Sequence, residues 1–91
     1  MFDDVYHSAL LHYVQGSGES GLAHAYELGR SALTGGDSLL HVVSVHEKAL
    51  STIVDATPSG DEARRRVQLS SRFLLEALSP FELMIHRACE G

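Results

Sequence analysis

The stretch LLEALSPFELMIHRA, Leu74 to Ala88, places a Ser-Pro pair inside the most apolar helical pattern of the chain. Inside a helix, proline removes one backbone hydrogen bond and either bends the helix or ends it. The run SPFE, residues 79–82, also fits a capping box that would start a new helix. The apolar residues nevertheless keep one helical phase across the proline, at Leu74, Leu78, Phe81, Ile85 and Ala88. We therefore predict one long helix that begins near Asp61 and continues through Pro80 with a kink.

Upstream of this stretch, glycine and proline divide the chain into three further helical segments. The run GSGESG, residues 16–21, ends the first segment, and the glycines at 35–36 end the second. Asp37 is expected to cap the third segment, which stops at Thr57-Pro58. The run SGDE, residues 59–62, reads as a capping box for the fourth. Short connections and the absence of strand-like alternation predict an all-α, antiparallel four-helix bundle, with residues 1–91 forming one domain.

Composition restricts the kinds of partner. The 12 acidic residues outnumber the 7 Lys and Arg residues and give a formal net charge of −5. Binding to nucleic acid or to an anionic membrane requires a basic surface, so we expect neither as a partner. Cys89 is the only cysteine, and no apolar run approaches the length of a membrane span. We expect a soluble, cytoplasmic domain without metal or cofactor.

The fourth segment carries more apolar residues than one stripe requires. A second row runs beside the first, and Leu75 and Leu83 widen it, so that more than one partner surface is needed to cover the helix. A two-fold dimer built on this helix would cover the excess, and the alternative is a helix that lies centrally within its own monomer. The residues predicted at the dimer interface are Leu69, Phe73, Ala77, Phe81 and Met84.

Six histidines raise the question of metal binding or catalysis. His7 and His12, like His41 and His46, are five residues apart, which is not the spacing that sets two imidazoles side by side on a helix. His46 lies on the apolar stripe of the third segment. It is either a packed core histidine or a phosphorylatable histidine of a phosphotransfer bundle, although the His-x-x-Lys-Gly pattern of such domains is absent. No catalytic residue set is recognisable, and we predict that the domain is not an enzyme.

Three runs resemble a known family. They are LAHAYEL at residues 22–28, SVHEKAL at 44–50 and FLLEAL at 73–78. Together with the tail SPFELMIHRA they are similar to the amino-terminal domain of RsbU, a PP2C-type serine phosphatase of the bacterial general stress response, whose fold is of the KaiA/RsbU type. The resemblance covers nearly the whole chain and implies an all-helical regulatory domain that dimerises and lacks catalytic residues of its own.

The resemblance also implies a partner and a surface. In RsbU this domain binds the switch kinase RsbT, and the attached phosphatase domain then dephosphorylates an anti-anti-sigma factor. The chain is then expected to be a piece of a longer phosphatase or a stand-alone dimerisation adaptor. By position, the family's partner-binding surface falls on Ala23, Tyr26, Glu27, Arg30, Leu75 and Ser79.

Overall fold

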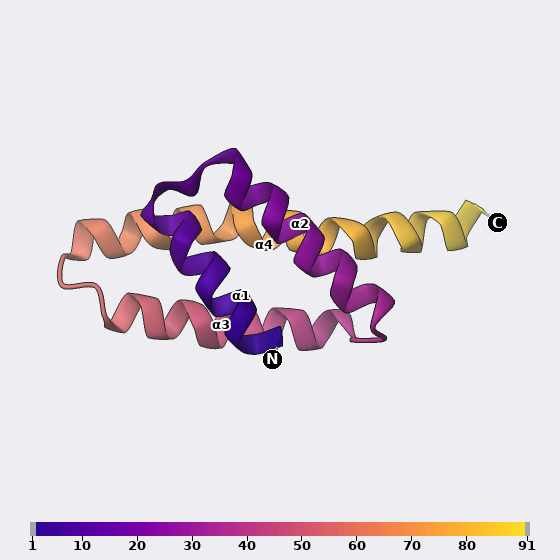
Figure 1. Cartoon of the computed structure of the whole chain (residues 1–91), viewed down its shortest axis with the longest axis horizontal. Coiled ribbons are helices and arrows are strands. Elements are labelled where there is room, and N and C mark those ends of the chain that lie inside the picture. The colour runs from indigo at the N-terminus through magenta and orange to yellow at the C-terminus, as the bar shows by residue number, and fades with distance from the viewer. Residues whose placement is uncertain (1, 91) are drawn as a thin grey trace.

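The computed structural model describes the backbone of residues 2–90 and the side chains of residues 2–85. Within this range the chain forms four α-helices and one short π-helical segment. The α-helices are α1 (Phe2–His12), α2 (Glu19–Thr34), α3 (Leu39–Asp55) and α4 (Gly60–Glu90), and the π-helical segment η1 (Tyr13–Ser17) follows α1 (Figure 1). No strand occurs in the described part of the chain. The predicted all-α fold with four helices is confirmed.

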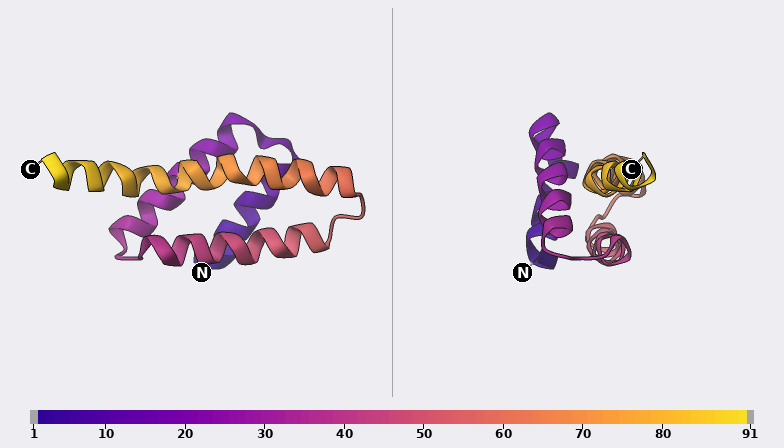
Figure 2. Two further views of the ribbon diagram at one scale, coloured as in Figure 1. Left: turned by 180° about the vertical axis from the view of Figure 1, so that it is seen from behind. Right: turned by 90° about the vertical axis from the view of Figure 1, so that its right-hand side faces the viewer.

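The four helices form two layers. The long helices α3 and α4 run side by side in opposite directions, and α1 and α2 cross them obliquely as a second layer (Figure 2). None of the helices in the described range is long and apolar enough to cross a membrane. The C-terminal turns of α4 extend beyond the other helices, so that neighbours cover only part of its length (Figure 1).

Local sequence explains most helix ends. Gly16 and Gly18 have positive φ angles of 117° and 62°, which non-glycine residues rarely adopt, and they turn the chain between α1 and α2. The cap of α3 differs from the prediction: Ser38, not Asp37, accepts a hydrogen bond from the His41 backbone N–H, at 3.0 Å. Ser38 has the extended backbone of an N-cap residue and is therefore the residue whose oxygen reaches the first turn.

The helix α4 is continuous through Pro80, as the apolar phase predicts. The alternative of a new helix at Ser79 is wrong, and the Ser79 hydroxyl instead donates to the carbonyl of Leu75, 2.9 Å away. Pro80 is buried. A kink at this position stays a prediction, and the side chains of Ala88 and Cys89 lie outside the described ones.

The core lies between the two layers and centres on aromatic side chains. Tyr6 of α1 meets Phe73 of α4 edge to face, with ring centroids 5.2 Å apart, and Tyr13 contacts the same phenylalanine. Edge-to-face pairs add favourable electrostatics to the burial of apolar area. Around these rings, every helix contributes small or aliphatic residues, which include Leu10, Ala25, Val42, Ile53 and Ala77.

Candidate functional site

The helices α2 and α4 pack tightly where they cross. A Cβ atom built on Gly29 would overlap the backbone carbonyl of Ala77, so only glycine permits this approach. Residues within about one turn of Gly29 and Ala77 therefore flank the same crossing. Tyr26 and Arg30 do so on α2, and Leu75 and Ser79 do so on α4.

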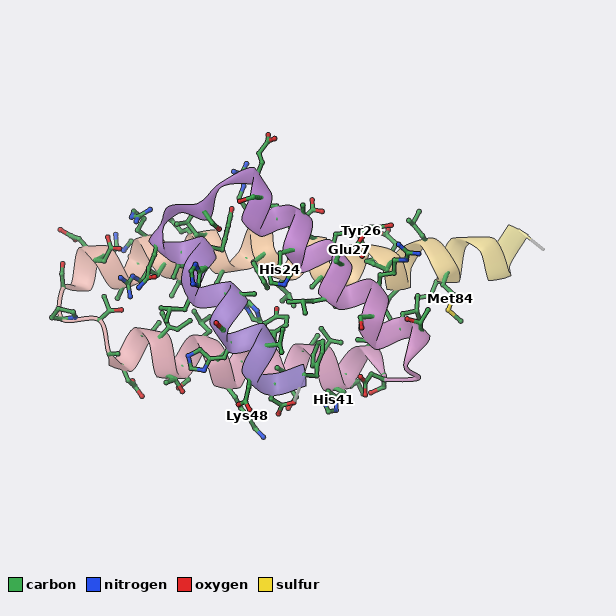
Figure 3. All side chains as sticks on the ribbon, in the orientation of Figure 1. His24, Tyr26, Glu27, His41, Lys48 and Met84 are labelled. Atoms are coloured by element: carbon green, nitrogen blue, oxygen red, sulfur yellow. The ribbon has the colours of Figure 1, made fainter. Side chains whose placement is uncertain are left out.

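The residues predicted to bind a partner are accessible around this crossing. Tyr26 and Ser79 are half-buried, and the other members, Ala23, Glu27, Arg30 and Leu75, are exposed. Tyr26 and Glu27 lie on the part of α2 that passes in front of α4 (Figure 3). Arg30 Nη1 lies 3.8 Å from Glu27 Oε1, which forms an exposed ion pair next to the crossing. The set thus combines a charged pair on α2 with an apolar side chain on α4.

A shallow apolar groove lies between α4 and the start of α3. It has a volume of about 250 Å³, and Leu75 and Ser79 line it together with Leu39, Phe81 and Ile85. Among the described large apolar side chains of α4, Leu75 is the most exposed, at 67%. The site is therefore a partly apolar surface without a deep catalytic cleft.

The residues predicted at a dimer interface divide into two groups. Phe73, Ala77 and Phe81 are buried within the single chain, because α2 and α3 both pack on this side of α4. These three residues thus form monomer core and are not on its surface. Leu69 is half-buried against the same core, and Met84 is exposed.

His46 is a core residue. Its side chain is buried, and its Nδ1 is hydrogen-bonded to the Tyr6 hydroxyl, 2.7 Å away inside the core. Burial lowers the pKa of His46 because charging it would cost desolvation, and burial likewise raises the pKa of Tyr6. An imidazole enclosed in this way is not presented for in-line phosphoryl transfer, so the phosphotransfer alternative is wrong.

The arginine cluster at the start of α4 has a structural role. Arg65 and Arg66 both donate to the Glu62 carboxylate, and these hydrogen bonds lower the pKa of Glu62. Arg65 also reaches the carbonyl of Val14, and Arg66 reaches the hydroxyl of Thr57. The two side chains therefore tie α4 to the ends of η1 and α3. Among the described residues, no group of three or more His, Cys, Asp or Glu side chains could hold a metal ion.

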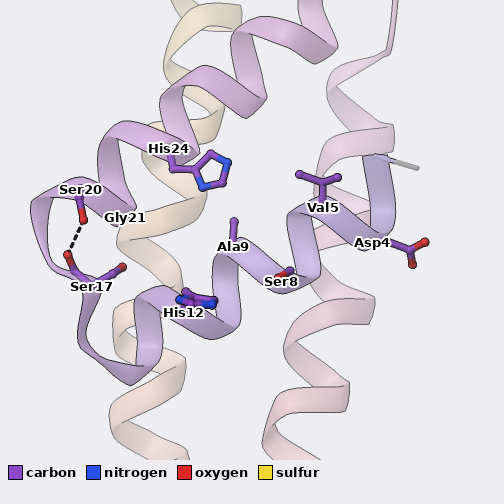
Figure 4. A pocket seen from close by; sticks show the side chains of 9 residues that line it. All are labelled: Asp4, Val5, Ser8, Ala9, His12, Ser17, Ser20, Gly21 and His24. Carbon is purple, nitrogen blue, oxygen red and sulfur yellow. Dashed lines mark hydrogen bonds between the residues drawn. The ribbon is translucent and has the colours of Figure 1, made fainter.

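A second concave feature was not foreseen from the sequence. A cleft of about 530 Å³ opens between α1 and α2, next to η1 (Figure 4). His12 and His24 line it, together with Ser8, Ser17 and Ser20. These residues come from three consecutive elements and show no motif spacing. The one signal in the sequence is that two histidines flank the glycine-rich run at residues 16–21.

The fold and the surface define a class of protein: a small helical domain with an exposed, partly apolar surface. The sequence profile of the N-terminal domain of the phosphoserine phosphatase RsbU matches residues 4–84. The chain therefore belongs to the RsbU N-terminal domain family, as the resemblance of the three runs implies. This membership supports a regulatory, protein-interaction domain of an RsbU-like phosphatase. No curated protein and no solved structure gave a significant match.

Proposed function

We propose that this domain recruits an RsbT-like switch kinase to an RsbU-like serine phosphatase in the cytoplasm. Binding of the kinase would activate the attached phosphatase, which then dephosphorylates an anti-anti-sigma factor and releases a stress-response sigma factor. The family match over residues 4–84 supports the regulatory role. The domain itself would act by binding and not by catalysis.

The observation that carries this proposal is the exposed Leu75 beside the α2–α4 crossing. Exposed apolar side chains bordered by polar groups are typical of protein-protein contacts, in which a few central residues supply most of the affinity. Leu75 is bordered by Ser79 and continues into the apolar groove towards α3. The Glu27 and Arg30 pair on the other side of the crossing would contribute orientation more than affinity.

We also propose that the domain forms a two-fold dimer through α4. The structure leaves Leu83, Met84 and Ile85 exposed in the C-terminal part of α4, whose last turns extend beyond the other helices (Figure 1). An isologous contact along this segment would cover the same apolar residues on both chains. Compared with the interface predicted from the sequence, the proposed interface includes Met84 and excludes the buried residues Phe73, Ala77 and Phe81.

The proposal is tested by titrating the domain with a purified RsbT-like kinase in a calorimeter. Leu75→Asp should weaken binding by tenfold or more, since it places a charge in a desolvated contact, and Tyr26→Ala should weaken it less. Val67→Asp is the matched control. Val67 is also an exposed aliphatic residue of α4, and it lies eight positions before Leu75, or about 12 Å along the helix.

The control variant should bind as the unchanged domain does. Equal affinity of the Leu75→Asp and Val67→Asp variants would overturn the proposed surface. Absence of binding by the unchanged domain to every RsbT-like kinase encoded in its source genome would overturn the recruitment function itself.

A further inference from the structure

The cleft between α1 and α2 has a polar end and an apolar end. Ser17 and Ser20 lie at one end of the cleft, His12 and His24 face each other across it, and Asp4 lies at the other end (Figure 4). None of the residues that carry the proposed kinase contact lines this cleft. It is thus a separate feature of the α1–α2 layer.

The polar end contains one buried hydroxyl that the described part of the chain does not satisfy. Ser17 Oγ is buried and has no hydrogen-bond partner among the described residues. A buried hydroxyl without a partner costs free energy, so such atoms usually have one in the functional state. The Ser20 hydroxyl donates to the Ser17 carbonyl over 2.8 Å and fixes the turn, and the Ser17 side chain lines the cleft beside Gly21.

The histidines add donors on both walls. His12 comes from α1 and His24 from α2, and both are exposed and line the cleft. A neutral imidazole donates one N–H, and a protonated one donates two and carries a positive charge. Two such rings with a serine hydroxyl complement an acceptor-only group such as a carboxylate.

The opposite end is suited to an apolar group. Val5 is 47% exposed although it is aliphatic, and the buried Ala9 lies between Val5 and the histidines. A bound carboxylate would lie at the histidines, which can donate hydrogen bonds to it, and the rest of the molecule would lie over Val5. A cavity of about 530 Å³ falls in the size range of sites for small organic ligands.

We propose that this cleft binds a small organic carboxylate with an apolar body. His12, His24 and Ser17 bind the carboxylate, and Val5 and Ala9 contact the apolar part. Through this site the domain binds a small molecule in addition to its proposed protein partner. It does not depend on the kinase-binding surface, because the two sets of residues do not overlap.

The experiment uses 3-phenylpropionate as the probe and follows the backbone amide signals of the 91-residue chain by NMR. Saturable shifts should appear in the residues of α1, η1 and the first turns of α2. The neutral analogue 3-phenylpropanamide has the same shape without the charge and should bind at least about tenfold more weakly, as expected when a charge-assisted hydrogen bond is lost.

Two variants test the two ends separately. The double variant His12→Ala and His24→Ala, and the single variant Val5→Asp, should each weaken binding of the probe by about tenfold. All three side chains are exposed, so the fold should be retained. His41→Ala is the control, since His41 is exposed on α3 and does not line the cleft.

Three results would overturn the proposal. They are shifts that do not saturate, shifts that map to α3 or α4, and equal affinity of the unchanged chain for the acid and the amide. Equal affinity of the histidine double variant and the His41 control would do the same. Each of these results concerns ligand binding alone and leaves the kinase titration unaffected.

Discussion

The apolar side chains of α4 lie in two opposite environments. In the middle of the helix, Phe73 and Ala77 are fully buried against the other helices. Beyond Glu82, Leu83, Met84 and Ile85 are as apolar and yet are exposed. The difference arises because α4 is longer than the helices that cover it (Figure 1). An apolar side chain is expected to be buried, but whether it is buried within the monomer depends on how far the neighbouring helices extend along α4.

The largest decrease in the free energy of unfolding should follow the loss of the central aromatic ring. Phe73→Ala removes the ring that Tyr6 and Tyr13 contact, and it should lower the free energy of unfolding by about 3–5 kcal/mol through lost burial and the cavity that remains. Leu83→Ala is the matched change at an exposed position of α4 and should lower the free energy of unfolding by under about 0.5 kcal/mol. Urea denaturation at a protein concentration that keeps the chain monomeric measures both. Similar losses of stability in the two variants would contradict the distinction between the buried and the exposed part of α4.

The crossing of α2 and α4 should be the next most sensitive position. Gly29→Ala places a methyl group against the Ala77 carbonyl, so the helices must separate, and the free energy of unfolding should fall by about 2–3 kcal/mol despite the better helix propensity of alanine. Gly60→Ala adds a methyl group at the start of α4, where nothing lies within 4 Å. That control should be neutral in the same denaturation experiment. A neutral Gly29→Ala variant would show that the close approach is not required.

The core should also respond to pH, through the buried His46 of α3. Because its pKa in the folded chain lies below the unfolded value of about 6.5, the unfolded chain takes up the proton first as the pH falls. The free energy of unfolding should therefore decrease below about pH 6.5, by at most about 1.4 kcal/mol per pH unit, until the pH reaches the folded pKa. Denaturation between pH 8 and pH 5 measures this slope.

A double variant isolates the contribution of His46 to this pH dependence. Tyr6→Phe combined with His46→Leu removes the titrating ring without leaving an unpaired hydroxyl, so the slope should become shallower. His41→Leu changes an exposed histidine and should leave most of the slope in place. If the double variant retained the full slope, another group would be responsible for it.

The smallest effect on stability should come from a substitution in the exposed part of α4 beyond Glu82. There we expect association to change instead. Met84→Asp should alter the free energy of unfolding of the monomer by under about 0.5 kcal/mol, because the side chain is exposed. It should nevertheless shift a dimer towards monomer in sedimentation equilibrium, since two charges would meet across a two-fold contact. An unchanged chain that sediments as a monomer of 9.9 kDa at every concentration would contradict the dimer.

Comparison of individual elements shows where sequence reasoning was sufficient. The glycine-rich break after Val14, the stop at Pro58 and the capping serine at Ser59 were all predictable, and Ser59 Oγ accepts from the Glu62 N–H at 3.4 Å. The continuation of α4 through Pro80 followed from the phase of its apolar residues. The cap of α3 was misplaced by one residue, because Asp37 and Ser38 are both good capping residues and only the backbone conformation distinguishes them.

Sequence alone thus determined the helices, most of their ends and the family of this protein, because caps, breaks and apolar periodicity act within a few residues of the chain. Tertiary structure decided which face of α4 is covered, so that Phe73 and Phe81 became core and Leu75 stayed exposed. It also decided the pairing of His46 with Tyr6, 40 residues away, and the cleft between α1 and α2. These features depend on how helices distant in sequence cross, and a glycine at position 29 sets one such crossing by permitting contact with the backbone of α4.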